Sequence, residues 1–152
     1  MLREIQNKDL KYDIVFDILN KLPDWFGIPE SIIEYATNSC NMPVYIYELE
    51  GKVVGFVTIK ETSVSSAEVY VMGILCEYHR KGIGRLFIKQ CEQYCIEHKF
   101  TFLQVKTLDS EVKNSSYLMT WEFYKSVGFL PLEVLPLWDE SNPCLVMVKY
   151  IG

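Results

Sequence analysis

Eight residues of the chain, Tyr78-His79-Arg80-Lys81-Gly82-Ile83-Gly84-Arg85, combine two glycines with three cationic side chains. They lie between an apolar pattern typical of a strand and an amphipathic pattern typical of a helix. Glycines at the start of a helix let the backbone turn its N–H groups outward around an anion, and the helix N-terminus adds partial positive charge. The stretch therefore predicts a phosphate or pyrophosphate site, to which Arg80, Lys81 and Arg85 add full charges.

Two common nucleotide-binding patterns do not fit this stretch. The third glycine of a Rossmann fingerprint would fall at Phe87, and the loop is expected to follow antiparallel strands. The chain also contains no Walker sequence of the form Gly-x-x-x-x-Gly-Lys-Ser/Thr. On its own, a Gly-x-Gly pattern can be only a tight turn, so its meaning depends on the elements around it.

The spacing of apolar residues predicts the elements that position this loop. Strands are expected over 2–6, 43–49, 52–61, 67–75, 100–107, 129–138 and 144–150, and helices over 10–21, 29–38, 82–99 and 116–127. Pro29 is suited to a helix start, Glu50-Gly51 to a tight turn, and Gly128 to a left-handed helix cap. The strand, helix and strand over 67–107 imply a parallel pair with a crossover. The predicted fold class is α/β, with a mixed sheet in which an antiparallel meander precedes one parallel crossover pair.

Length and composition narrow the classes of protein. The chain has 152 residues, of which 49% are apolar, so it can bury one sizeable core. A formal charge of −5 disfavours a general nucleic-acid binder, which needs a basic face. The stretch Met1–Gln6 carries charges where a signal peptide would be apolar, and no long apolar run follows. We therefore expect a soluble cytoplasmic protein with neither nucleic-acid nor membrane partners.

The cysteines indicate reduced thiols rather than disulfides or a metal centre. The five cysteines, at 40, 76, 91, 95 and 144, show no closely spaced pairs, and there are only two histidines. Zinc sites usually need such pairs, so no metal is expected. Cys91 and Cys95 lie four residues apart and should be neighbours on the buried face of the helix that follows the glycine loop.

Two motifs together resemble the GNAT family of N-acetyltransferases, which use acetyl-coenzyme A. The pyrophosphate motif of that family is Gln/Arg-x-x-Gly-x-Gly/Ala, with a Val or Ile five residues before it. Here Gly82 and Gly84 match the glycines, Ile74 matches the apolar position, and His79 replaces Gln or Arg. A second stretch, Phe123-Tyr124-Lys125-Ser126-Val127-Gly128-Phe129, is similar to the family signature Phe/Leu-Tyr-x-x-x-Gly-Phe. The order and separation of the two motifs also fit.

The resemblance implies a single GNAT-like domain over residues 1–152 that transfers acetyl from acetyl-coenzyme A directly to a primary amine. The pyrophosphate would bind main-chain N–H groups from Arg80 to Arg85, and the pantetheine arm would lie where the parallel strands separate. A backbone N–H near Ile74 would then polarise the thioester carbonyl. The residues expected to contact the coenzyme are Met72, Gly73, Ile74, His79, Arg80, Lys81, Gly82, Ile83, Gly84, Arg85, Tyr117 and Tyr124.

Two residues are the predicted catalytic groups. Tyr124 matches the family tyrosine that protonates the departing thiolate, and a phenol stays protonated at neutral pH. Glu68 lies six residues before Ile74, as does the general-base glutamate of the histone-acetylating branch; the alternative is a solvated residue at a strand start. Tyr117 stands where many relatives have an Asn that contacts the coenzyme arm. Cys76 has no neighbouring base in the sequence, and direct transfer needs no nucleophile.

The acceptor is predicted only as a primary amine on a small molecule, peptide or protein. Trp25, Phe26 and Trp138 flank connections that overhang the acceptor site in the family, and Tyr70 shares the strand face of Glu68. These four residues are candidate acceptor contacts; the alternative is packing or loop solvation, which is the more frequent role of isolated residues of this kind. A rival hypothesis is a non-catalytic acyl-coenzyme A sensor or regulatory module, and a weaker one is an interaction protein whose loop is only a turn. The resemblance leaves the oligomeric state open, a homodimer being common in the family.

Overall fold

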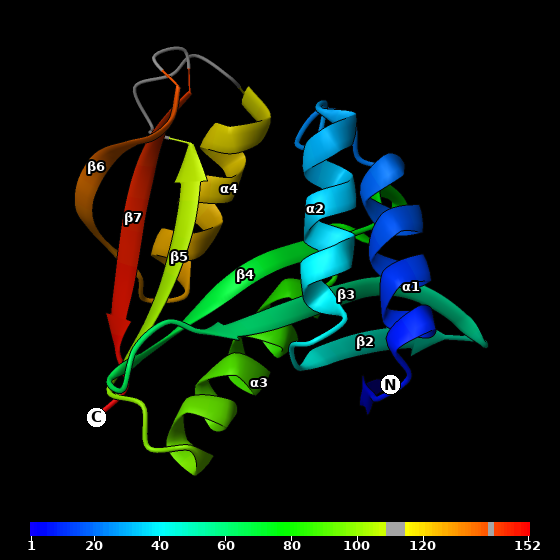
Figure 1. Cartoon of the computed structure of the whole chain (residues 1–152), viewed down its shortest axis with the longest axis horizontal. Helices are drawn as coiled ribbons and strands as arrows, with labels where there is room; N and C mark the ends of the chain where they lie inside the picture. The colour runs from blue at the N-terminus through cyan, green and yellow to red at the C-terminus, as the bar shows by residue number, and fades with distance from the viewer. Residues whose placement is uncertain (109–114, 140–141) are drawn as a thin grey trace. The chain divides into compact units, whose positions relative to one another are not determined.

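The computed structural model describes residues 1–108, 115–139 and 142–152 (Figure 1). Its elements are β1 (Leu2–Ile5), α1 (Lys8–Asn20), α2 (Pro29–Ser39), β2 (Val44–Leu49), β3 (Lys52–Glu61), β4 (Ser66–Ile74), the 3-10 turn η1 (Cys76–Tyr78), α3 (Ile83–Glu97), β5 (Phe102–Leu108), α4 (Ser115–Ser126), β6 (Leu130–Asp139) and β7 (Asn142–Tyr150). The predicted strands and helices are confirmed to within a few residues at each end. The η1 turn was not predicted.

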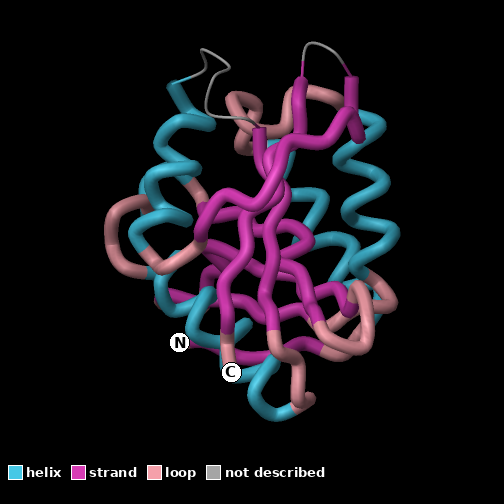
Figure 2. Tube along the Cα trace, turned by 90° about the vertical axis from the view of Figure 1, so that its left-hand side faces the viewer, coloured by secondary structure: helices cyan, strands magenta, loops and turns pink. Residues whose placement is uncertain are grey.

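The strands form a mixed sheet, as predicted. In the described residues the order is β1-β2-β3-β4-β5-β7-β6, with β4 and β5 as a parallel pair. The pairs β1–β2, β2–β3, β5–β7 and β6–β7 are antiparallel. Strands (magenta) and helices (cyan) can be followed in Figure 2.

The chain divides into two compact units. The first unit comprises residues 1–60 and 70–90, and the second comprises residues 61–69 and 91–152. The division passes through β4 after Val69 and through α3 after Gln90. The single domain expected from the sequence over residues 1–152 stays a prediction.

The first unit has a core between α1, α2 and the strands. The helix α1 begins at Asn7, whose side chain accepts a hydrogen bond from the Leu10 N–H at 2.9 Å, and α2 begins with Pro29 as predicted. Apolar residues of both helices recur at helical spacing and pack with strand residues in one cluster: Ile14, Val15, Ile18, Leu19, Ile32, Ala36, Val44, Ile46, Phe56 and Val71. The two helices run side by side in Figure 1. This core supports the strand end and the loop that carry the first half of the site.

In the second unit α4 packs against β5, which pairs with β7, and β7 pairs with β6 (Figure 1). Its apolar side chains Leu103, Phe129 and Met147 are fully buried. As predicted, α4 ends with a left-handed glycine: Gly128 has φ +102°, and the Phe129 N–H donates to the Tyr124 carbonyl at 3.0 Å. This cap fixes the C-terminal turn of the helix that carries Tyr124.

Lys149 of β7 ties the end of α4 to α3. Its Nζ donates to the Val127 carbonyl at 2.7 Å and lies 3.1 Å from a carboxylate oxygen of Glu92. We expect Lys149→Met to lower the free energy of unfolding by about 1–2 kcal/mol, because the helix loses a charge-assisted bond at its negative end. Urea denaturation should show this, with Lys89→Met on the exposed side of α3 as the control. Equal midpoints for the two variants would contradict the prediction.

The cysteines differ in exposure. Cys91 and Cys95 are fully buried, as expected from their spacing, and Cys144 is buried in β7. Burial raises the pKa of the Cys95 thiol to about 11, with the Glu92 carboxylate adding to the effect, and burial also raises the pKa of Cys91. Burial is the main cause of the raised pKa of Cys144. By contrast, Cys76 is exposed at the start of η1.

Over the residues that the structure describes, no helix has the length and apolar character needed to cross a bilayer. Within the same ranges, no three His, Cys, Asp or Glu side chains are grouped so that they could hold a metal ion.

Candidate functional site

The glycine loop of the first unit has the backbone of an anion site. After η1, Arg80 adopts a left-handed conformation with φ +61°, and Gly82 another with φ +83°. When left-handed residues alternate with residues of negative φ, successive backbone N–H groups point toward the same side. These N–H groups form a concave, anion-binding row. The helix α3 then begins at Ile83, and the Leu86 N–H donates to the Gly82 carbonyl at 3.2 Å. In any α-helix the first N–H groups have no acceptor within the helix, so the start of α3 suits an anion.

The charged side chains of this loop are all at the surface. Arg80, Lys81 and Arg85 are exposed, whereas Ile83 is 3% exposed and anchors the start of α3 in the core. The loop thus combines main-chain donors, the helix dipole and exposed cationic side chains in one short segment. This combination suits a diphosphate.

We predict that Gly82→Ala weakens binding of coenzyme A about 5- to 20-fold. An added Cβ would have nothing within 4 Å, so the cost comes only from the left-handed φ, at about 1–2 kcal/mol. Gly51, in the β2–β3 turn, is a matched control, since its φ is +78° and its Cβ position is equally open. Gly51→Ala should lose similar stability but keep the coenzyme affinity, as measured by calorimetric titration. Equal coenzyme affinities for the two variants would show that the loop is not part of the coenzyme site.

The end of β4 lies directly before this loop in the chain. The pairing of β4 with β5 extends from Ser66↔Phe102 to Val69↔Val105, whereas β4 continues to Ile74 and β5 to Leu108. The parallel pairing therefore stops before either strand ends, as predicted for strands that separate. The Leu75 N–H donates to the Val54 carbonyl of β3 at 2.9 Å, which holds the strand end on its other side.

Close packing in the first unit explains why residue 73 is a glycine. A Cβ built there would lie 3.0 Å from Ile18 Cγ2 of α1 and 3.0 Å from Phe56 Cε1 of β3. The missing side chain therefore admits α1 and the Phe56 ring, and any coenzyme contact at Gly73 would use its main chain. Met72 and Ile74, on either side of it, are half-buried.

His79 connects the loop to the strand end within the first unit. Its Nε2 lies 2.6 Å from the Ile74 carbonyl oxygen, and the Trp25 ring packs edge-on against the imidazole at 5.5 Å. Two further aromatic residues predicted to contact the acceptor border the same core cluster: Phe26 packs against Tyr35, and Tyr70 packs against Tyr35 and accepts a hydrogen bond from Asn38 at 2.8 Å. Trp25, Phe26 and Tyr70 thus all pack against the one core cluster to which α1 and α2 contribute.

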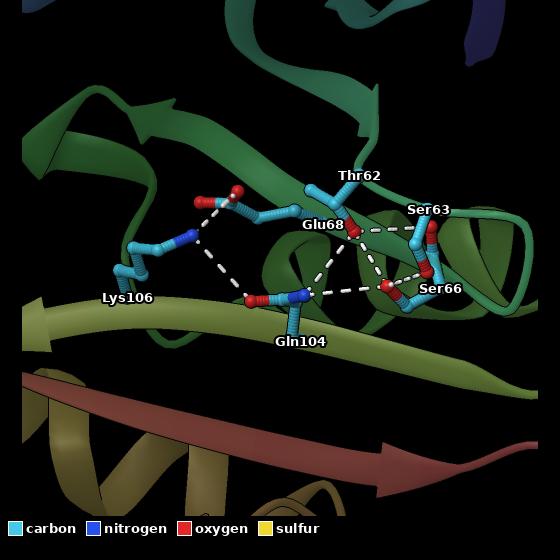
Figure 3. Close-up of polar contacts among 6 residues, drawn as sticks. All are labelled: Thr62, Ser63, Ser66, Glu68, Gln104 and Lys106. Atoms are coloured by element: carbon cyan, nitrogen blue, oxygen red, sulfur yellow. Dashed lines mark hydrogen bonds and ion pairs between the residues drawn. The ribbon is translucent and has the colours of Figure 1, made fainter. Parts of the chain in front are cut away.

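Glu68, in the second unit, is buried and ion-paired. The residue is 4% exposed, and its Oε1 lies 2.9 Å from Lys106 Nζ of β5. The alternative of a solvated residue at a strand start is therefore wrong. In Figure 3 the contacts continue from Lys106 to Gln104 at 3.4 Å, and from the Gln104 amide to Thr62 and Ser66. This network fixes the carboxylate from the β5 side.

Lys106 is absent from the sequence-based predictions. Its strand alternates polar residues, Gln104 and Lys106, with buried apolar ones, which indicates a polar face but no partner. The partner follows from register, because Glu68 pairs with Gln104 across the parallel strands and so brings Lys106 within reach.

Tyr124 lies in the last turns of α4, in the second unit. The residue is 6% exposed, and its ring packs against Phe123 at 5.3 Å and Phe129 at 5.5 Å. Tyr117 falls two helical turns earlier, but its side chain lies outside the part of the chain that the structure describes. Trp138, at the end of β6, is 41% exposed. The structure therefore places Trp138 in a different unit from the other three aromatic candidates.

Comparisons with known proteins agree with this fold and these motifs. The family model described as the acetyltransferase (GNAT) family matches residues 12–129, so the chain belongs to the GNAT family. An uncharacterized N-acetyltransferase of Chlorobaculum tepidum is 28% identical over 119 residues, which cover 76% of this chain and 66% of that protein, just under two thirds of its length.

Solved structures share the fold at low identity. A protein from Desulfovibrio desulfuricans assigned to the GNAT family has a TM-score of 0.84 and 13% identity, with 100% of this chain and 99% of that chain covered. An aminoglycoside 6′-N-acetyltransferase complexed with coenzyme A has a TM-score of 0.79 and 17% identity, with 100% of this chain and 97% of that chain covered. These likenesses concern the fold, which is that of GNAT acetyltransferases.

Proposed function

We propose that this protein transfers the acetyl group of acetyl-coenzyme A directly to a primary amine. The observation that carries the proposal is the loop from His79 to Arg85, where two left-handed residues precede the N-terminus of α3. Such a loop favours a diphosphate, and coenzyme A is the diphosphate ligand that the family membership supplies. The aminoglycoside enzyme with the same fold, solved with coenzyme A, supports the same ligand.

In the proposed reaction, the neutral amine nitrogen attacks the thioester carbon, and the carbon–sulfur bond then breaks. The pyrophosphate binds main-chain N–H groups between Arg80 and Arg85, and the pantetheine arm follows Met72 to Ile74. The Ile74 N–H stabilises the negative oxygen of the tetrahedral intermediate. Tyr124 gives its proton to the departing thiolate sulfur, which leaves as the free thiol of coenzyme A.

Glu68 is the proposed acceptor of the proton that the amine loses. Its burial limits contact with bulk water, and Lys106, which also donates to Gln104, holds it in one orientation, as a base that acts directly or through one water requires. Lys106 is then a positioning residue rather than a catalytic one. The resulting products are the N-acetylated amine and coenzyme A.

The proposed acceptor is a small molecule or peptide that carries a primary amine. The aromatic group of Trp25, Phe26 and Tyr70 offers apolar walls for the body of such a molecule. Lys60 Nζ lies over the Tyr70 ring at 5.5 Å, so the edge of this group already carries a positive charge. We expect acceptors that combine an amine with an apolar or neutral body to react better than polycationic ones.

Calorimetric titration with coenzyme A and acetyl-coenzyme A tests the first half of the proposal, and micromolar binding is expected. A panel of amines is then added with acetyl-coenzyme A, including peptides with free N-termini, lysine, a polyamine and an aminoglycoside. Free thiol released and a mass increase on the amine would identify the acceptor. Binding with no transfer across the panel would favour an acyl-coenzyme A sensor, and no binding at all would refute the proposal.

A further inference from the structure

We propose that His79 is a positioning residue that holds the anion-binding loop in register with the end of β4, so that one coenzyme molecule can occupy both. The inference rests on the proposed function, because it concerns how the same ligand is held. It assigns a role to the position at which this chain departs from the Gln or Arg of the family motif.

The imidazole holds one particular peptide group. Because the Ile74 carbonyl oxygen can only accept, the His79 Nε2 at 2.6 Å carries a hydrogen and donates it. The N–H of the same peptide group belongs to Leu75 and donates to the Val54 carbonyl at 2.9 Å. The peptide at the end of β4 is therefore held from both sides, by β3 and by His79.

On the loop side, His79 stands at the point where the backbone changes direction. Its N–H donates to the Cys76 carbonyl at 3.2 Å, and its backbone is extended, with φ −66° and ψ +153°. The next residue, Arg80, is the first left-handed residue of the loop, with φ +61°. The imidazole bond thus closes the segment from Ile74 to His79 directly before the anion-binding row begins.

Trp25 restricts the orientation of the imidazole. The two ring centroids are 5.5 Å apart with an interplanar angle of 75°, which is a favourable edge-to-face contact. His79 is half-buried, so this contact and the bond to Ile74 together hold the ring in one orientation. The connection between α1 and α2, which contains Trp25, therefore supports the loop through His79.

The hydrogen bond from His79 to the Ile74 carbonyl matters most for a ligand that contacts both the anion-binding loop and the end of β4. In the proposed mode the pyrophosphate binds the loop and the pantetheine arm binds the strand end. The intact coenzyme can therefore use both sets of contacts only if the distance between the loop and the strand end is fixed. A ligand that binds one place alone has no such requirement. Loss of the His79 hydrogen bond should therefore weaken binding of the intact coenzyme and leave binding of its fragments nearly unchanged.

The test uses His79→Phe, which keeps a ring for Trp25 to pack against and removes the N–H donor. We expect the Kd of coenzyme A to rise about 10-fold, and the Kd values of ADP and of pantetheine, each measured by NMR titration, to change less than about twofold. His79→Gln should restore most of the coenzyme affinity, since a side-chain amide can donate to the same carbonyl. The control is His98→Ala, because His98 is the other histidine and its Nδ1 lies 3.0 Å from the Tyr94 carbonyl.

Two results would overturn the inference. An unchanged Kd of coenzyme A in His79→Phe would show that the bond does not affect binding, and an equal loss for ADP would show that His79 shapes the loop alone. If the wild-type protein bound no coenzyme A, the proposed function itself would fail, which the first titration reveals separately. Circular dichroism confirms folding, and His79→Met replaces the Phe variant if that variant does not fold.

Discussion

Replacing Tyr124 with phenylalanine is expected to lower kcat about 100-fold and to change the Kd of coenzyme A by less than about twofold. The size of the effect follows from loss of a general acid, which ordinarily contributes two to four orders of magnitude. The ring remains, so its contacts with Phe123 and Phe129 and the helix end are preserved. Steady-state rates of thiol release, together with calorimetric titration of the coenzyme, measure the two quantities.

A matched control for this variant is Tyr94→Phe. Tyr94 is 7% exposed against 6% for Tyr124, belongs to the same unit, and donates its hydroxyl hydrogen to Glu61 at 2.7 Å. Its replacement should lower stability modestly and leave kcat nearly unchanged. Similar kcat values in the two variants would remove the proton-donor role from Tyr124.

Replacing Glu68 with glutamine is expected to lower kcat/KM about 30- to 100-fold near neutral pH, because the amide has the same shape but cannot take up a proton. In both proteins the rate should rise toward basic pH as the amine substrate loses its own proton. Glu68→Gln should lie below the wild type across the whole range, because the amide cannot take up the amine proton at any pH. A pH profile of kcat/KM from 6 to 9.5 for both proteins measures the difference.

Two further variants separate catalysis from packing at Glu68. Glu61→Gln removes a carboxylate from the neighbouring strand of the same unit and should leave the pH profile unchanged. Lys106→Met removes the ion-pair partner and should lower kcat/KM by less than Glu68→Gln does, since the base is still present. An identical profile in wild type and Glu68→Gln would assign the proton to another group or to bulk water.

Much of the fold could be predicted because its signals are local. The apolar spacing of α1 and α3, Pro29 at the start of α2 and Gly128 at the end of α4 are readable from a few neighbouring residues. The turn at Glu50-Gly51 is likewise local, and both residues have positive φ. The short η1 turn was missed, since three residues carry too little periodicity to be recognised.

The parts of the site that depend on local backbone conformation could be predicted from the sequence. The parts that depend on the register between strands were harder to predict. Gly82 indicated a backbone turn at the start of a helix, and the structure makes this turn with a left-handed φ. Arg80 has the same conformation but no sequence signal, because non-glycine residues seldom adopt it. The pair of Glu68 with Lys106 joins residues 38 positions apart and needs the parallel register of β4 and β5. The contact of Trp25 with His79 similarly depends on packing between distant segments.

The uneven exposure of the thiols has a practical consequence for the detection of ligand binding. Cys91, Cys95 and Cys144 are shielded and have raised pKa values, and Cys40 is half-buried with its thiol donating to the Ala36 carbonyl. A maleimide reagent at neutral pH should therefore couple first to the exposed Cys76. That residue precedes the anion-binding loop by only a few positions. A fluorophore attached there would act as an optical reporter of ligand arrival without any engineered substitution.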